Sequence, residues 1–246
     1  MEYYQGFDKY LVAVDCIIFG FDENDLKVLI LKRKIEPAKG KWSLMGGFIK
    51  RDESLDEGAR RILLQLTGLS NIFMEQLHAF GGVARDPGAR VISVAYYALI
   101  KVNHSDKELA EAHGAHWVSV RNNLNLIFDH SQMVSKALDV LRRRIVMQPI
   151  GFELLPEKFT LPQFQTLYEV INQEPLDKRN FRKRILETGL LEKLDEKEKL
   201  TSKKGAFYYR FNKERYEMYK ELGFHFQLKP KKDLLIKVSN SVNESE

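Results

Sequence analysis

The densest group of chemically useful side chains lies between residues 178 and 184, where five of seven residues are basic. Lysine and arginine can neutralise phosphates, and arginine and asparagine can form paired hydrogen bonds with guanine and adenine edges in the major groove. A basic run on a helix is, however, more often a solvated surface than a nucleic-acid site. The candidate DNA contacts in this run are Lys178, Arg179, Asn180, Arg182 and Lys183.

Two helices are predicted around this basic run. Thr160 is a suitable N-cap for an amphipathic helix, and after a break at 174–176 Asp177 is an N-cap for a second helix that ends at Gly189. Phe181 and Ile185 lie four residues apart and can face the core together, which leaves the basic residues facing outward. This is the arrangement in which the second helix of a helix-turn-helix enters the major groove.

A hairpin is predicted directly after these helices. The strand-like runs LLEKLDEKEKL and GAFYYRFN are joined by residues 201–205, which contain Lys203 and Lys204. Helix, turn, helix and hairpin, in this order, predict a winged helix whose basic wing tip adds two candidate DNA contacts.

A second group of candidate residues, Glu53, Asp56 and Glu57, lies in the first half of the chain. Carboxylates of this kind can hold a hard cation such as Mg²⁺. They also precede or open a helix expected from Ser54 to Thr67, where acidic residues interact favourably with the helix dipole. The sequence favours this capping role over metal binding.

The spacing of Gly47, Glu53, Arg61 and the pair Gly68-Leu69, preceded by WSLMGGF, resembles the Nudix box of diphosphate hydrolases. In that family the box is a loop and helix whose glutamates hold a divalent metal over a diphosphate. The resemblance implies an α/β Nudix-like fold, a mixed sheet between helices.

The metal-binding glutamates of the box are missing from this chain. Ile62, Gln65 and Leu66 occupy their positions, and this spacing puts them on one face of the helix. The sequence therefore predicts a domain that is not an enzyme and has no catalytic residue, metal or cofactor. Its pocket can still bind a small-molecule effector, because a fold and its chemistry are separable.

Five candidate effector contacts follow from the placement in the Nudix family. They are Arg33, Trp42, Glu53, Arg85 and Tyr96. The alternative is that the aromatic residues are core or pocket wall and the arginines are solvated surface charges. His130 is expected to be an ordinary polar residue at a helix start.

Strands are expected at 10–21, 26–33, 90–100 and 115–120, and an amphipathic helix at 129–146. Prolines and a glycine then interrupt the periodicity. The predicted organisation is a Nudix-like domain at 1–148, a linker at 149–159, a winged helix-turn-helix at 160–226 and a partly flexible extension at 227–246.

Composition limits the class of protein. With 44% hydrophobic residues the chain can form proper cores, so disorder is excluded, and its net charge of +5 is too small to indicate nucleic-acid binding by itself. The apolar runs fit strands rather than membrane spans, and no signal peptide is evident, which favours the cytoplasm. The lone cysteine, Cys16, is expected to be a buried apolar residue.

Together these segments resemble the NrtR family of Nudix-related transcriptional regulators over nearly the whole chain. Besides the box, the matching segments are RDPGARVISVAYYAL, FDHSQMVSKALDVLR, LLPEKFTLPQFQTLYE and LDKRNFRKRILETGLL. The resemblance implies a homodimer that binds double-stranded operator DNA and releases it when an effector binds. Some members respond to ADP-ribose and others govern sugar catabolism, and this chain is more similar to the branch that controls arabinose use.

Two other functions remain open at this point. The chain could be a Nudix hydrolase of ADP-ribose or another nucleoside diphosphate with an accessory domain, although the missing glutamates oppose this reading. Alternatively, the C-terminal domain could bind protein or RNA, because winged helices serve those roles too.

Overall fold

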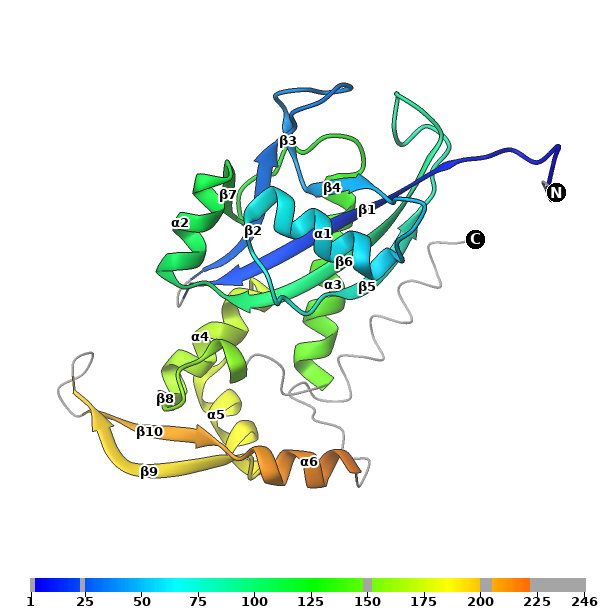
Figure 1. The fold of residues 1–246 in the computed structure, drawn as a ribbon. Helices are drawn as coiled ribbons and strands as arrows, with labels where there is room; N and C mark the ends of the chain where they lie inside the picture. The colour runs from blue at the N-terminus through cyan, green and yellow to red at the C-terminus, as the bar shows by residue number, and fades with distance from the viewer. Residues whose placement is uncertain (1–2, 23–24, 148–151, 200–204, 222–246) are drawn as a thin grey trace, which may run out of the picture. The chain divides into compact units, whose positions relative to one another are not determined.

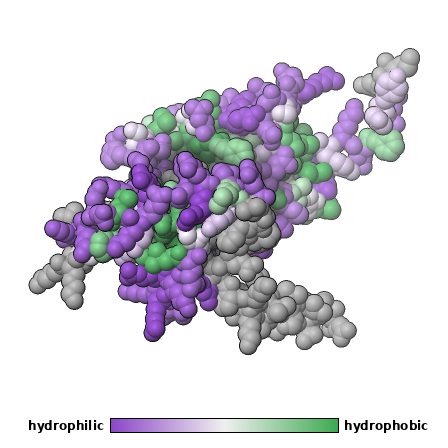
Figure 2. Space-filling model, turned by 90° about the horizontal axis from the view of Figure 1, so that it is seen from below, coloured by the Kyte–Doolittle hydropathy of each residue, from purple (hydrophilic) through white to green (hydrophobic). Residues whose placement is uncertain are grey.

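A computed structural model of the chain describes residues 3–22, 25–147, 152–199 and 205–221. The chain folds into two compact units, Met1–Asp139 and Val140–Glu246 (Figure 1). Hydrophilic side chains cover most of the face shown in Figure 2, where hydrophobic ones form separate patches. Within the described ranges, no helix is long and apolar enough to cross a membrane.

The described part of the first unit contains a mixed sheet of seven strands. They are β1 (Leu11–Phe21), β2 (Leu26–Lys32), β3 (Trp42–Ser43), β4 (Met45–Phe48), β5 (Glu75–Phe80), β6 (Val91–Lys101) and β7 (Ala115–Ser119). β1 is central, running parallel to β6 and antiparallel to β2 and β4. Its residues 13–21 are all buried, as the continuous apolar sequence predicts for a strand covered on both faces.

Three helices accompany this sheet: α1 (Leu55–Thr67), α2 (His104–Ala112) and α3 (His130–Met147). Ser54 and Glu57 form a reciprocal capping box at the start of α1, and Gly68 ends the helix with a φ of 74°. Ala59, Ile62 and Leu63 of α1 are buried in the core. The capping role predicted for Glu57 is therefore confirmed.

The second unit contains a three-stranded sheet and three helices in its described part. Its elements are a 3₁₀ turn η1 (Phe152–Leu154), β8 (Phe159–Thr160), α4 (Leu161–Asn172), α5 (Lys178–Glu187), β9 (Leu191–Glu198), β10 (Ala206–Phe211) and α6 (Lys213–Glu221). β10 is the central strand, antiparallel to β8 and β9. Helix, helix and hairpin occur in the predicted order, so the predicted fold class, Nudix-like α/β followed by a winged helix, is confirmed.

The segment 149–159 was expected to be a linker, but its described residues pack into the second unit. Phe152 is buried and stacks on Phe164 and Phe211, with ring centroids 4.7 and 3.8 Å apart. Phe159 pairs with β10. These aromatic residues join the core of the second unit because burying them is favourable, so packing begins before Thr160. The predicted extension at 227–246 lies outside the described residues.

Candidate functional site

The basic residues of α5 lie on its outer surface. Asp177 caps the helix by accepting a hydrogen bond from the Asn180 backbone N–H at 2.7 Å. Phe181 and Ile185 are buried, which turns the opposite side of α5 toward solvent. All five predicted DNA contacts are exposed: Lys178, Arg179, Asn180, Arg182 and Lys183.

A polar network missed by the sequence analysis holds the turn between α4 and α5. Gln165 donates to Glu169 at 2.8 Å and to the Leu176 carbonyl at 3.1 Å, and Glu169 accepts the Leu176 N–H at 2.9 Å. These bonds fix the angle at which α5 leaves α4. The one sign of this network in the sequence is Gln165, a polar residue on the apolar face of the predicted helix.

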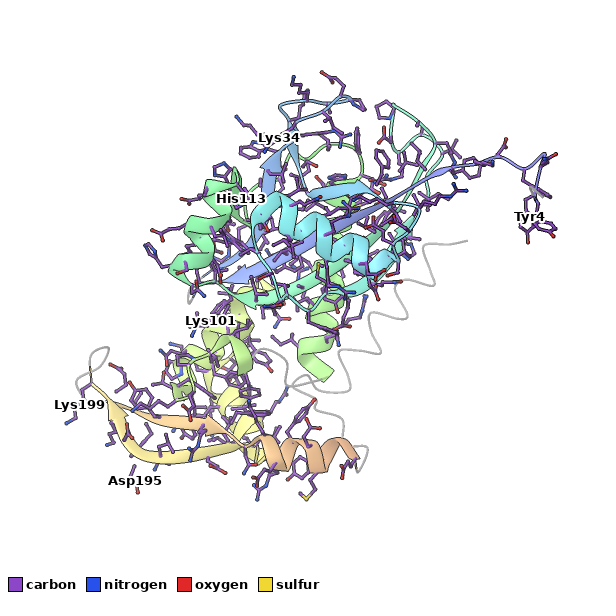
Figure 3. The ribbon with its side chains drawn as sticks, viewed as in Figure 1. Tyr4, Lys34, Lys101, His113, Asp195 and Lys199 are labelled. Atoms are coloured by element: carbon purple, nitrogen blue, oxygen red, sulfur yellow. The ribbon has the colours of Figure 1, made fainter. Side chains whose placement is uncertain are left out.

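The wing is formed by β9 and β10, as predicted, but its tip is not described. Lys203 and Lys204 lie outside the described residues, so their candidate role as DNA contacts stays a prediction. The stem of the hairpin carries further lysines (Figure 3).

The degenerate Nudix box is packed as an apolar surface. Ile62 is 3% exposed and lies so close to Gly47 that a Cβ there would be 2.9 Å from Ile62 Cδ1. Gln65 accepts a hydrogen bond from Arg61 at 3.2 Å, and Leu66 is half-buried against the core. Ile62 and Leu66 therefore offer no oxygen atom to a cation on this face of α1.

Glu53 is engaged by Arg61 and is not available as a free ligand. Arg61 Nε donates to Glu53 Oε2 at 2.7 Å, a second guanidinium nitrogen pairs with Oε1, and the Lys50 N–H donates to Oε1 at 2.7 Å. The hydrogen bonds from Arg61 lower the pKa of Glu53 to about 2. Among the residues that the structure describes, no group of three His, Cys, Asp or Glu side chains could hold a metal.

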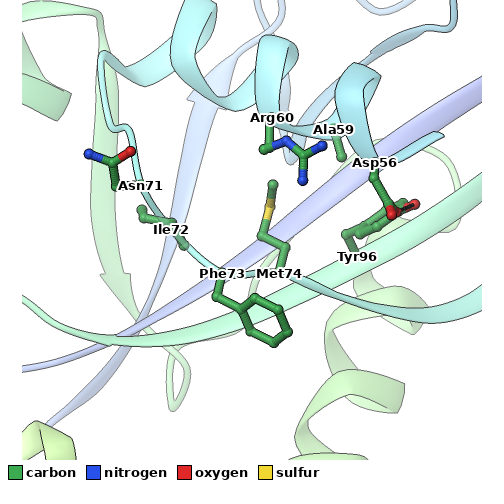
Figure 4. A pocket seen from close by; sticks show the side chains of 8 residues that line it. All are labelled: Asp56, Ala59, Arg60, Asn71, Ile72, Phe73, Met74 and Tyr96. Carbon is green, nitrogen blue, oxygen red and sulfur yellow. Dashed lines mark hydrogen bonds between the residues drawn. The ribbon is translucent and has the colours of Figure 1, made fainter. Parts of the chain in front are cut away.

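A cavity of about 380 Å³, which we call the α1 pocket, opens beside the start of α1 (Figure 4). It is lined by Asp56, Ala59, Arg60, Asn71, Ile72, Phe73, Met74 and Tyr96. The Tyr96 hydroxyl donates to Asp56 and accepts from Gln76 at 2.9 Å. Burial, followed by the bond to Asp56, raises the pKa of Tyr96 to about 12, and the same bond lowers the pKa of Asp56. Tyr96 is therefore the predicted effector contact that lines this pocket.

Three other predicted effector contacts converge on the segment 127–130. The Arg33 guanidinium lies 5.4 Å from the centre of the Phe128 ring, and the Trp42 carbonyl accepts the Ile127 N–H at 3.0 Å. Arg85 donates to both carboxylate oxygens of Asp129, at 2.9 and 2.7 Å. Glu53 and Tyr96 are not part of this group, so the five candidates do not form one site.

Arg85 is not a surface charge but the centre of a buried polar cluster. Its side chain is 4% exposed and also lies 3.6 Å from Asp15, which accepts a hydrogen bond from Ser93 at 2.6 Å. His130 Nε2 is 3.6 Å from Asp15, and Nδ1 accepts the Leu44 N–H at 3.1 Å. Burial lowers the pKa of His130, so the ring is neutral at pH 7. The sequence signal was a charged residue, Asp15, inside an otherwise apolar strand.

Comparison with known proteins identifies both units. A NUDIX domain model matches residues 9–137, and the NrtR DNA-binding winged helix domain matches residues 151–211. The "ADPR responsive transcriptional repressor NtrR" of Acinetobacter baylyi is 33% identical over 211 residues, which cover 84% of each chain. The chain belongs to the NrtR family. The family resemblance seen in the sequence is thereby confirmed, whereas these relatives do not show the arabinose branch.

Solved structures agree with this membership. Shewanella oneidensis NrtR complexed with a 27mer DNA is 28% identical, with a TM-score of 0.68 over 84% of this NrtR family member and 95% of that chain. The NUDIX domain of the same protein, complexed with ADP ribose, is 30% identical over 57% of this chain and 94% of its own, with a TM-score of 0.50. An ADP-ribose pyrophosphatase of Methanocaldococcus jannaschii is 34% identical over 123 residues, half of this chain and 70% of its own.

Proposed function

We propose that this chain is a cytoplasmic, DNA-binding transcriptional repressor, active as a homodimer, whose Nudix domain binds a small-molecule effector and thereby causes release of the operator. The observation that carries the proposal is α5, a capped second helix of a winged helix with its basic side exposed. Lys178, Arg182 and Lys183 are proposed to contact phosphates, and Arg179 and Asn180 to read base edges.

For the effector, the relatives favour ADP-ribose over a sugar. One relative is named for its response to ADP-ribose, and the NUDIX domain of another has been solved with that ligand. The α1 pocket suits such a ligand, because Phe73, which is 82% exposed, can stack on a base and Arg60 can bind a phosphate. L-arabinose, suggested by the sequence resemblance, is the rival that the experiment must separate.

The test is fluorescence anisotropy with a labelled duplex from the protein's own promoter region and a scrambled duplex of equal length. We expect preference for the promoter duplex, and release on addition of one effector only, ADP-ribose or L-arabinose. Arg179→Gln should weaken promoter binding by about 1 to 3 kcal/mol and leave effector affinity unchanged. Lys34→Gln, at an exposed lysine of the β2–β3 loop (Figure 3), is the matched control. Equal affinity for both duplexes would refute the proposal.

We also propose that the Nudix domain does not hydrolyse its ligand. Ile62 and Leu66 supply no cation ligand, and Gln65 and Glu53 both accept hydrogen bonds from Arg61. The similarity to an ADP-ribose pyrophosphatase makes a direct assay necessary. Incubation of the protein with ADP-ribose and Mg²⁺ should yield no AMP, while the same assay with a competent pyrophosphatase serves as the positive control.

A further inference from the structure

One face of the β9–β10 hairpin lies on the side of the sheet on which the helices pack. Tyr209 and Phe211 of β10 lie on this helix-facing side. Tyr209 is buried, and Phe211 stacks on Phe152. Phe152 in turn stacks on Phe164 of α4. Because side chains two positions apart in a strand share a face, Phe207 lies on this helix side as well, farther along the hairpin. The hairpin extends past α4 and α5 at that end (Figure 1).

Two lysines of β9 gather over Phe207 on this face. Lys193 Nζ is 3.6 Å from the centre of the Phe207 ring and Lys197 Nζ is 4.4 Å from it. Neither ammonium group has an acidic partner among the described residues. Both ammonium groups lie within 4.4 Å of the same ring centre, so their like charges repel each other, and an anion bound beside both would relieve the repulsion. We call Lys193, Lys197 and Phe207 the wing clamp.

A change of register in β9 brings the two lysines together. Phe207 is paired with Lys197 and Tyr209 with Lys193, so two residues of β10 face four of β9. The extra residues bend β9, as bulges do, and Figure 1 shows its curvature. In a regular ladder the ring of Phe207 would meet only one of these lysines.

The opposite face of the same hairpin carries two ion pairs. Glu192 lies 3.7 Å from Arg210, and Glu196 pairs with Lys158, whose ammonium lies over the Tyr208 ring at 5.2 Å. Glu192 and Glu196 therefore have basic partners on one side of the hairpin, whereas Lys193 and Lys197 gather on the other.

We infer that the wing clamp binds the sugar–phosphate backbone of DNA beside the groove that α5 enters. The inference rests on the proposed DNA-binding function and adds contacts in the stem of the wing to those of the helix. Ammonium groups held over an aromatic ring are already positioned, so little side-chain freedom is lost when they meet a phosphate. The contact reads no sequence, because every duplex presents the same phosphates.

The test measures the salt dependence of duplex binding by full-length protein in which Lys193 and Lys197 are both changed to Gln. Each lost phosphate contact reduces the slope of log K against log salt by about 0.9, so the double variant should lose about 1.8. Its loss of affinity should be about 12 times larger at 50 mM than at 200 mM salt. The loss should be equal for promoter and scrambled duplexes.

Two further variants serve as controls. Lys158→Gln removes a cation from the opposite face of the hairpin and should leave the slope unchanged. The double variant Lys193→Arg with Lys197→Arg keeps both charges and should retain the wild-type slope. An unchanged slope in the Gln variant, with wild-type thermal stability and promoter preference, would overturn the wing clamp and leave the proposed function standing. Wild-type protein without promoter preference would instead overturn the proposed function.

Discussion

Replacement of Arg85 by Met tests whether the buried cluster stabilises the first unit. The Arg85 side chain is 4% exposed and forms two hydrogen bonds with Asp129, while the side chains of Asp15 and Asp129 are 6% and 15% exposed. Methionine fills similar space but leaves two carboxylates without their cation. Removing one partner of a buried ion pair costs about 3 to 5 kcal/mol of unfolding free energy.

Thermal unfolding followed by circular dichroism measures this effect. For a unit of this size, a loss of 3 to 5 kcal/mol lowers the midpoint by roughly 10 to 15 °C. Arg51→Met, at an exposed arginine of the loop before α1, is the control and should shift the midpoint by less than about 2 °C.

A second variant separates the loss of the ion pair from general damage to packing. Arg85→Met combined with Asp129→Leu removes both the cation and its hydrogen-bonded carboxylate, and should recover much of the lost stability. If the unfolding midpoint of the single variant lies within about 2 °C of the wild-type midpoint, the Arg85–Asp129 pair does not stabilise the first unit as a buried ion pair, and the expectation is refuted.

Three further outcomes follow from local geometry. His130 has a lowered pKa in the folded chain, so the unfolded chain binds more protons at this residue. The free energy of unfolding should therefore fall as pH drops below about 6.5. His130→Asn should flatten this dependence, as measured in urea titrations at several pH values. Gly46→Ala should destabilise by at least about 1 to 3 kcal/mol, because the new Cβ would lie 2.1 Å from a buried carboxylate oxygen, whereas Gly81→Ala meets nothing within 4 Å and should be silent in the same melts. Tyr168→Phe removes a buried hydroxyl that has no hydrogen-bond partner among the described residues, and a raised unfolding midpoint is expected; a fall would contradict this.

The elements predicted correctly from the sequence are those with local end signals. Ser54 and Gly68 bound α1, and Asp177 and Thr188, the residue before Gly189, bound α5, because caps act within one turn of the helix that they end. The exposed side of α5 was predicted from the apolar pair Phe181 and Ile185, which lie one turn apart and are both buried. Such signals need no knowledge of the rest of the fold.

The elements missed from the sequence depend on distant partners. β5, α2 and α6 are mostly polar, with Ala110 of α2 their one buried residue among those described, so no apolar period along the chain indicates them. Arg85 was weighed as a surface charge because its partner Asp129 is 44 residues away. The α1 pocket likewise joins Asp56 to Tyr96 across the fold. No period or spacing along the chain carries this information.

The packing of Ile62 against Gly47 also limits how the chain can evolve. A return of glutamate at position 62 alone would bury a carboxylate in the core with no cation beside it, since Gln65 and Leu66 cannot complete a metal shell and Glu53 is occupied by Arg61. Restoring a glutamate at position 62 by itself therefore lowers stability before it can support a metal site. The order of substitutions is thereby constrained: position 62 can accept a glutamate without this loss only after other cation ligands are in place beside it.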